Sequence, residues 1–547
     1  MPWLRARNSL ARDLAMRIPD GPIFVDPLPS QVTGVDFLGL AAVNERLVAL
    51  SFPGISNVTR YLRAYSAMSW MTWRFAEYLK QEAERKSMSE RDIGRRFRRF
   101  REKVELLFTL GNPDHNQVAG QTRRDHLPER GRFPLEFSAF GNFKISWLDA
   151  AVYGPSLGSE NGLGFLERAP GASYRPTLLG EELARGLDAV LQKSPYYNAL
   201  IDVEANTGSN ELVSDLGERW AVRESSARER EVYRKGLFPE NAGVEGGSLR
   251  ANRVAMIRLV LRAVKLHGGR ATIDEVRQAI ARGLTASGKG LELADCAKTQ
   301  GMWSVLQLRQ LQRLAHESLL RWLEGTLLNP PSTLKGRTPA ALAELAAQQT
   351  AAYFDAETSD PLQLVLDRLK TPKSTPDFYI AGLSRPRLDP FRALDDLQGL
   401  ADVENHTPQL PGMALYCLAL CAKQAEFLTT SENRAPWLGI GGRSRLSLRS
   451  LTELFSVYRS ESLSEFMRFL IESCVVGQHF AITGAKLEAD KNKYRFISTD
   501  EGLRLLIRPN QITRLNVTGD RLQNAMELMA DCALLSTTET SGTFALP

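Results

Sequence analysis

The chain has 547 residues and a formal net charge of +6, with 43% hydrophobic and 24% charged residues. This length predicts about three or four domains, and the composition is typical of a folded globular protein rather than a disordered one. The five cysteines are scattered, no run approaches the ~20 apolar residues of a membrane-spanning helix, and the first residues lack the apolar segment of a secretory signal. We therefore expect a cytoplasmic protein that contacts no membrane.

Two long helices are predicted in the N-terminal part. Residues 55–85 carry apolar or aromatic side chains at every third or fourth position, with Asn57 or Thr59 available as a cap. Aromatic residues with this spacing usually pack in a core, and we expect that here rather than stacking on bases. The second helix begins at Ser89 and ends near Gly111, with apolar residues on one face and arginines on the rest.

The second helix concentrates positive charge. Residues 85–103 include nine basic and three acidic side chains, a local net charge of +6 that equals the net charge of the whole chain. Guanidinium and ammonium groups bind phosphate oxygens, so we expect contacts to the phosphate backbone of duplex DNA that do not depend on base sequence. The residues expected to make these contacts are Arg91, Arg95, Arg96, Arg98, Arg99 and Lys103.

A winged-helix-like unit is predicted at the end of the N-terminal domain. A short apolar segment at 147–153 precedes two short strands within 162–176, and Thr177 would cap a helix that ends near Leu191. This order of helix, strand, turn, strand and helix is the one expected of a winged helix. Residues 202–250 are rich in Gly, Ser, Glu and Arg, and are expected to form a linker or a solvated helix.

The central region is predicted to be helical. One amphipathic helix ends at Gly268 and Gly269, and Thr272 caps the next, so the pair is either a helix-turn-helix or a helical hairpin. A long helix at 302–328 follows, with Trp303 and Trp322 in its apolar stripe. Prolines then mark a loop-rich connection to C-terminal helices at about 411–430, 446–458 and 462–476.

A second winged-helix-like module is predicted near the C-terminus. Residues 480–482 and 494–497 would form its strands, and Thr499 or Asp500 would cap a last helix at 501–508. A packed two-stranded element with solvated lysines, or a protein-binding module, is the alternative. The basic residues that would reach phosphates from this wing are Lys486, Lys491, Lys493 and Arg495.

These patterns together predict a mainly α, multidomain protein with winged-helix-like α+β modules. The expected parts are an N-terminal helical domain at 1–201, a linker or solvated helix at 202–250, a central helical domain at 251–360 and a C-terminal helical domain at 361–547.

Three patterns approach catalytic or metal sites, and each lacks a required part. The run at 283–290 nearly fits a phosphate-binding loop, but a glycine stands where the Mg²⁺-binding hydroxyl is needed, and the preceding residues are helical. Asp202 and Glu204 could hold a metal for phosphodiester cleavage, yet no suitably spaced lysine follows them. His115 and His126 lack the further ligands of a zinc site. We therefore expect no cofactor, no metal and no catalysis.

Several segments together resemble a group of poorly characterised bacterial proteins encoded in multi-gene antiphage-defence loci. They are 36–40 and 52–59 with Arg63, Tyr65 and Trp70, and the stretches at 303–322 and 478–496. The resemblance implies a non-catalytic subunit that binds DNA or assembles other protein subunits, beside a separate ATPase or nuclease. Three roles stay open: a DNA-binding subunit, a protein scaffold without DNA binding, and a cryptic metal-dependent nuclease.

Overall fold

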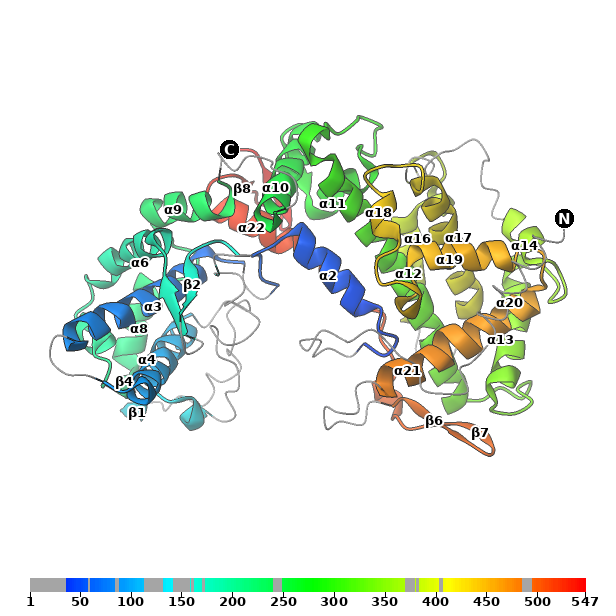
Figure 1. Ribbon diagram of the computed structural model, residues 1–547, viewed down its shortest axis with the longest axis horizontal. Helices are drawn as coiled ribbons and strands as arrows, with labels where there is room; N and C mark the ends of the chain where they lie inside the picture. The colour runs from blue at the N-terminus through cyan, green and yellow to red at the C-terminus, as the bar shows by residue number, and fades with distance from the viewer. Residues whose placement is uncertain are drawn as a thin grey trace. The chain divides into compact units, whose positions relative to one another are not determined.

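The computed structural model describes residues 36–57, 60–83, 88–112, 131–140, 158, 162–169, 173–239, 248–368, 379, 383–402, 407–484 and 494–547. In these ranges the protein is mainly helical, with small antiparallel sheets (Figure 1), as the sequence predicts. The described residues form two compact units. The first lies within 1–47, 278–290 and 297–518, and the second within 48–277, 291–296 and 519–547. The four-part division expected from the sequence stays a prediction.

The second unit begins with the two long helices that the sequence predicts. Helix α3 (Leu62–Ala83) buries Tyr65 and Trp70 completely, so its aromatic residues belong to the core. Helix α4 (Glu90–Leu110) starts at the N-cap Ser89, whose hydroxyl oxygen accepts a hydrogen bond from the backbone N–H of Asp92.

A strand pair and its following helix also agree with the sequence. Strands β2 (Leu166–Ala169) and β3 (Ser173–Pro176) are antiparallel, and helix α6 (Leu178–Leu191) follows with Thr177 as its N-cap. The apolar segment at 147–153 lies outside the described residues.

Residues 202–250 differ from the expected linker or solvated helix. They contain strand β4 (Thr207–Ser209), which pairs with β1 (Arg132–Pro134), and the helices α8 (Asn210–Arg219) and α9 (Ala227–Leu237). Both helices are charged on one face, which gives the sequence its polar composition, while the other face is buried. In α9 the buried residues include Glu229, whose charge is neutralised by Arg63 of α3.

The second unit ends in elements from distant parts of the sequence. Helix α10 (Leu249–Leu266) stops at Gly268 and Gly269, which both have positive φ angles, and strand β5 (Arg270–Thr272) and helix α11 (Ile273–Arg282) follow. The chain returns much later with helix α22 (Leu522–Asp531) and strands β8 (Ser536–Thr537) and β9 (Thr543–Ala545). Strand β9 lies between β5 and β8 in one antiparallel sheet.

The first unit is organised around helix α12 (Ala297–Leu328), which packs against α16 (Pro390–Ala401), α17 (Leu410–Leu428) and the π-helix η7 (Leu470–Gly477). Almost every side chain of α12 is buried, including many polar ones, where the sequence predicts a single apolar stripe. The other helices of this unit are α13 (Pro339–Phe354), α14 (Leu362–Asp367), α18 (Ala435–Leu438), α19 (Leu448–Val457), α20 (Leu463–Phe469) and α21 (Gln478–Gly484). Two helices belong to both units: α2 (Ala41–Ser51), which is divided after Leu47, and α11, which is divided after Arg277.

The expected secondary structure of the C-terminal wing is wrong. Residues 480–482 belong to helix α21 rather than to a strand, because the buried apolar stripe continues through η7 beyond Gly477. The hairpin consists instead of β6 (Phe496–Thr499) and β7 (Gly502–Leu505), so the expected helix at 501–508 is absent from these described residues. Gly502 has φ +108°, which suits the tight turn, and its carbonyl accepts a hydrogen bond from the Thr499 hydroxyl.

Among the helices that the structure describes, none combines the length and hydropathy needed to cross a bilayer.

Candidate nucleic-acid interface

Three exposed arginines on one face of α4 form the outer arginine row: Arg91, Arg95 and Arg98. Their spacing of i, i+4 and i+7 aligns them along the helix, over a length of about 10 Å at 1.5 Å per residue. Arg95 Nη2 lies 2.8 Å from Oδ1 of Asp92, an exposed pair that contributes little energy. Arg91 and Arg98 have no hydrogen-bond or ion-pair partner within the described ranges, so their guanidinium groups are available to a ligand.

Two further arginines of α4, Arg96 and Arg99, form the inner arginine pair. They face the loop that follows helix α7 (Tyr197–Ile201). Arg96 Nη1 lies 2.9 Å from Oε1 of Glu204, and Arg99 Nη1 lies 3.8 Å from Oε2 of the same side chain. Arg96 also lies over the ring of Tyr78 of α3, 5.9 Å from its centroid. The inner pair is therefore already bound to an anionic group of the protein.

Lys103 is placed in the interior rather than on the exposed face. Its side chain is almost completely buried, and its ammonium group donates to the backbone carbonyls of Ala199, at 3.1 Å, and Asp202. Burial lowers the pKa of Lys103 to about 8, and the nearby charge of Asp202 opposes that shift. In this position Lys103 holds the loop after α7 against α4, and it is not part of the exposed row.

The basic residues of the expected wing give no second contact surface. Lys486, Lys491 and Lys493 lie outside the described residues. Arg495 is buried in the first unit and binds Glu324 of α12 through two nitrogens, at 2.7 and 3.0 Å. Its guanidinium group also lies 4.3 Å from the centroid of the Phe37 ring. These contacts show Arg495 in a structural ion pair.

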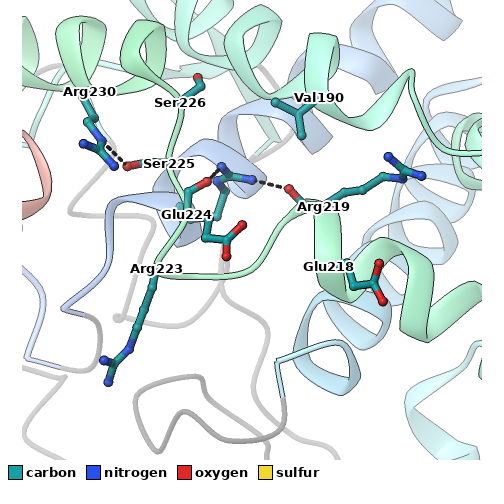
Figure 2. A pocket seen from close by; sticks show the side chains of 9 residues that line it. Val190, Glu218, Arg219, Arg223, Glu224, Ser225, Ser226 and Arg230 are labelled. Atoms are coloured by element: carbon teal, nitrogen blue, oxygen red, sulfur yellow. Dashed lines mark hydrogen bonds between the residues drawn. The ribbon is translucent and has the colours of Figure 1, made fainter.

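A pocket of about 470 Å³ in the second unit is rich in arginine (Figure 2). Arg63 lines the pocket and donates to the backbone carbonyls of Arg219, at 2.7 Å, and Glu224. Its lining residues are Arg63, Val190, Glu218, Arg219, Arg223, Glu224, Ser225, Ser226 and Arg230.

The charges around this pocket cancel. Arg63 Nε lies 3.1 Å from Oε1 of Glu229, and Arg219 forms two hydrogen bonds to Asp215, at 2.9 and 3.0 Å. The two remaining arginines are balanced by the two glutamates of the lining. The pocket therefore lacks the excess positive charge that would favour an anionic ligand.

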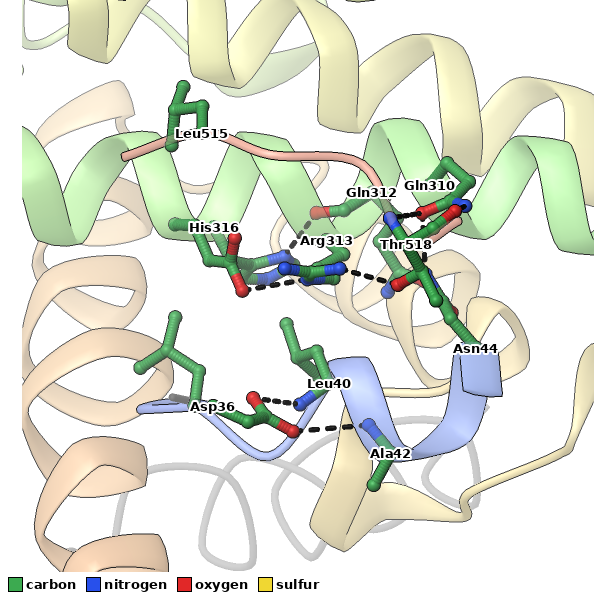
Figure 3. A network of polar contacts seen from close by, with 12 residues as sticks. Asp36, Leu40, Ala42, Asn44, Gln310, Gln312, Arg313, His316, Leu515 and Thr518 are labelled. Carbon is green, nitrogen blue, oxygen red and sulfur yellow. Dashed lines mark hydrogen bonds and ion pairs between the residues drawn. The ribbon is translucent and has the colours of Figure 1, made fainter. Parts of the chain in front are cut away.

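A second polar cluster, in the first unit, surrounds α12 (Figure 3). The Asp36 carboxylate accepts hydrogen bonds from the backbone N–H groups of Leu40 and Ala42, at 3.0 and 3.1 Å, at the start of α2. Arg313 binds Glu317 at 2.7 Å and the Thr518 hydroxyl at 2.5 Å. The contact with Thr518 ties a distant chain segment to α12, which indicates a role in packing.

The sequence did not identify this polar cluster. Polar side chains that recur at helical spacing are typical of a solvated face, and only the packing of neighbouring segments shows that they are buried. His316 illustrates the effect, because burial lowers its pKa to about 4 and keeps the ring neutral. His479 is buried as well, and its Nε2 accepts a hydrogen bond from the backbone N–H of Arg495 at 3.1 Å.

The other chemical candidates have structural positions or lie outside the described residues. The Asp202 carboxylate accepts a hydrogen bond from the Glu204 N–H at 2.9 Å, and Glu204 faces the inner arginine pair. At 283–290, Leu284 pairs with Gly290 across a turn. No group of three or more His, Cys, Asp or Glu in the described ranges is arranged to hold a metal ion. His115 and His126 fall outside those ranges.

Comparisons of the chain with protein-family models, with curated proteins and with solved structures find no match.

Proposed function

We propose that this protein binds nucleic acid, duplex DNA in the first instance, by contacting the phosphate backbone with the outer arginine row. The observation that carries the proposal is the alignment of Arg91, Arg95 and Arg98 on one exposed face of a helix, two of them without a partner in the described structure. Each guanidinium group can donate two parallel hydrogen bonds to a phosphate and release condensed counterions from the duplex.

The rest of α4 is held firmly, which supports a preformed contact surface. Phe100 and Val104 are fully buried, and Lys103 is bound to the backbone carbonyls of the loop after α7. The aromatic residues near the arginines also pack internally. Phe97 and Tyr78 lie 5.0 and 5.8 Å from the ring of Phe75, so they support α4 rather than stack on bases. The contacts would therefore position a nucleic acid without reading its sequence.

We also propose that the winged-helix module of this protein is a split one. Helix α10, strand β5 and helix α11 are followed, after the inserted residues of the first unit, by α22, β8 and β9. The sheet order β5-β9-β8 is the order expected of the three strands of a winged helix. Besides the pairing of β5 with β9, further hydrogen bonds connect the pieces: for example, the Ile273 N–H donates to the Gly542 carbonyl, and Arg277 donates to Asp520.

The third helix of this split module, α22, already contacts protein. Along one face, Arg521 and Asn524 donate to the backbone carbonyls of Ile55 and Ser56, at 2.8 and 2.9 Å. Further along, Glu527 pairs with Arg60, and Asp531 accepts from the Leu62 N–H at 2.8 Å. The helix that reads DNA in many winged helices is acidic here and covered by the same chain. These contacts argue against DNA reading by α22, and the assembly of other protein subunits is the second candidate role, which the sequence resemblance implies.

Both roles fit a non-catalytic subunit of a multi-protein bacterial antiphage-defence complex, which the sequence resemblance implies. In such a complex, ATP hydrolysis or nucleic-acid cleavage would belong to a separate subunit. We propose that the present chain supplies the phosphate contacts and the protein contacts.

The test is charge reversal of the whole outer row in the variant Arg91→Glu/Arg95→Glu/Arg98→Glu. Binding to a duplex of mixed sequence should fall by more than tenfold, measured by fluorescence anisotropy at several salt concentrations. The slope of log K against log salt should become shallower by about 2.7, because each of the three lost phosphate contacts contributes about 0.9 to the magnitude of that slope.

The matched control reverses three exposed arginines elsewhere, Arg228→Glu/Arg392→Glu/Arg443→Glu, so that the net charge of the protein changes equally. This control should retain most of the affinity and the wild-type slope. If both triple variants lost the same amount of duplex affinity, the loss would result from the change in net charge rather than from the outer arginine row, and the proposal would be overturned. Absence of duplex binding by the wild type, together with an association with partner subunits that persists at high salt, would leave only the assembly role.

A further inference from the structure

Glu204 occupies the position that a phosphate would take on the inner arginine pair. One carboxylate oxygen lies 2.9 Å from Arg96 Nη1, and the other lies 3.8 Å from Arg99 Nη1. The Glu204 side chain remains about half exposed, with 51% of its surface accessible, so this ion pair lies at the surface where a competing anion can reach it.

The loop that carries Glu204 is fixed at both ends. On one side, the buried ammonium group of Lys103 holds the carbonyls of Ala199 and Asp202, and the Asp202 carboxylate accepts from the Glu204 N–H. On the other side, the Asn206 carbonyl accepts from the Leu135 N–H at 2.7 Å, just before β4 pairs with β1. The carboxylate is therefore held near the arginines by the backbone, and its position does not depend on the ion pair alone.

We infer that Glu204 is a built-in competitor for nucleic-acid phosphates, which divides the arginines of α4 into an available row and a masked pair. The inference rests on the proposed function of the outer row and concerns the regulation of that same site. With Glu204 charged, a nucleic acid binds the outer row alone. When the charge of Glu204 is removed, the guanidinium donors of Arg96 and Arg99 that face Glu204 become available to phosphates, although Arg96 keeps its contact with Tyr78, and the contact extends around the helix.

The test is Glu204→Gln in the full-length protein, because glutamine keeps the size of the side chain and removes its charge. Duplex affinity should rise about two- to fivefold, the range that corresponds to a surface ion pair. The slope of log K against log salt should steepen by up to about 1.8, since two more phosphates can be neutralised. The matched control is Glu231→Gln, because Glu231 is also an exposed glutamate paired to a cation, Lys235 at 3.1 Å.

The four outcomes separate the inference from the proposed function. Tighter binding and a steeper slope in Glu204→Gln, but not in Glu231→Gln, support the inference. Binding that is equal in both variants, with loss on reversal of the outer row, overturns the inference and keeps the proposed function. A wild type that does not bind, beside a Glu204→Gln variant that does, overturns the proposed function of the outer row and keeps the masking of the inner arginine pair by Glu204. Absence of binding in every variant overturns both.

Discussion

Burial changes the acid–base properties of individual side chains in the second unit. Asp531, at the end of α22, is mostly buried, and its carboxylate accepts a hydrogen bond from the Leu62 N–H at the start of α3. Loss of water raises the pKa of Asp531 to about 6, and the hydrogen bond from Leu62 only partly opposes that shift. The contact between α22 and α3 is therefore sensitive to mildly acidic pH.

A pH dependence of stability follows from this raised pKa. The folded state binds the Asp531 proton more tightly than the unfolded state, so this contribution to stability is complete below about pH 4 and is lost as pH rises through 6. The loss amounts to about 3 kcal/mol, at 1.36 kcal/mol for each pH unit between the ordinary pKa of 3.8 and the raised pKa of about 6. Asp531→Asn should remove this loss, measured by urea denaturation of the second unit between pH 4 and 7.

The control for this measurement is Asp396→Asn, because Asp396 is an exposed carboxylate of the first unit with 50% of its side-chain surface accessible. Asp396→Asn should leave the dependence of the second unit's unfolding free energy on pH unchanged. If Asp531→Asn and the wild type showed parallel profiles over this range, the raised pKa of Asp531 would be contradicted.

At the scale of single elements, apolar periodicity together with end signals predicts helices well. The ends of α4, α6 and α10 follow from Ser89, Thr177 and Gly268, because capping is local in sequence. The prediction of the C-terminal wing was wrong because the structure of this segment depends on contacts that are distant in sequence. Whether residues 480–482 form a helix or a strand depends on the core around α12, and a short apolar run is compatible with either.

The candidate site was predictable only in part. The cluster of arginines in α4 is visible in the sequence, but exposure separates Arg91 and Arg98 from the buried Lys103. The pairing of Glu204 with Arg96 joins residues more than a hundred positions apart, and no local pattern indicates it. Arg495 was misplaced for the same reason, since its partner Glu324 belongs to a distant helix.

The hairpin β6–β7 gives a prediction at this scale. Gly502 has φ +108°, and a Cβ atom there would collide with the backbone of Arg337. Gly502→Ala should therefore destabilise the first unit by about 1–3 kcal/mol, measured by chemical denaturation. Gly399→Ala is the control, because Gly399 lies in helix α16 with no atom within 4 Å of the position that a Cβ would take, and alanine there should stabilise by about 0.5–1 kcal/mol. Equal effects of the two changes would contradict the strained turn.

At the scale of the whole molecule, the second unit combines residues 48–277 with residues 519–547, which are far apart in the sequence. Strand β5 needs β9 as its neighbour, and the start of α3 is capped by Asp531. A protein that ends at Thr518 lacks these partners. We expect this truncation to unfold α3 and α10, measured as faster amide hydrogen exchange, and to abolish duplex binding although α4 is intact in sequence.

The first unit provides the internal control for this truncation. Its elements lie within 1–47, 278–290 and 297–518, so the exchange of α12 and α17 should stay slow. Slow exchange of α3 and α10 in the truncated protein would show that the second unit does not depend on the C-terminal elements.

The pairing of β5 with β9 also sets an order of events during synthesis. Residues 270–272 leave the ribosome long before residues 543–545, which pair with them. At about 5–20 residues per second, the intervening chain takes roughly 15–55 s to make. During this interval, the elements of the second unit that are made first lack the partners that later cover part of their apolar surface. The second unit, most of which is made before residue 278, is therefore completed only after the first unit has been made, and chaperones or partner subunits made at the same time would meet it during this interval.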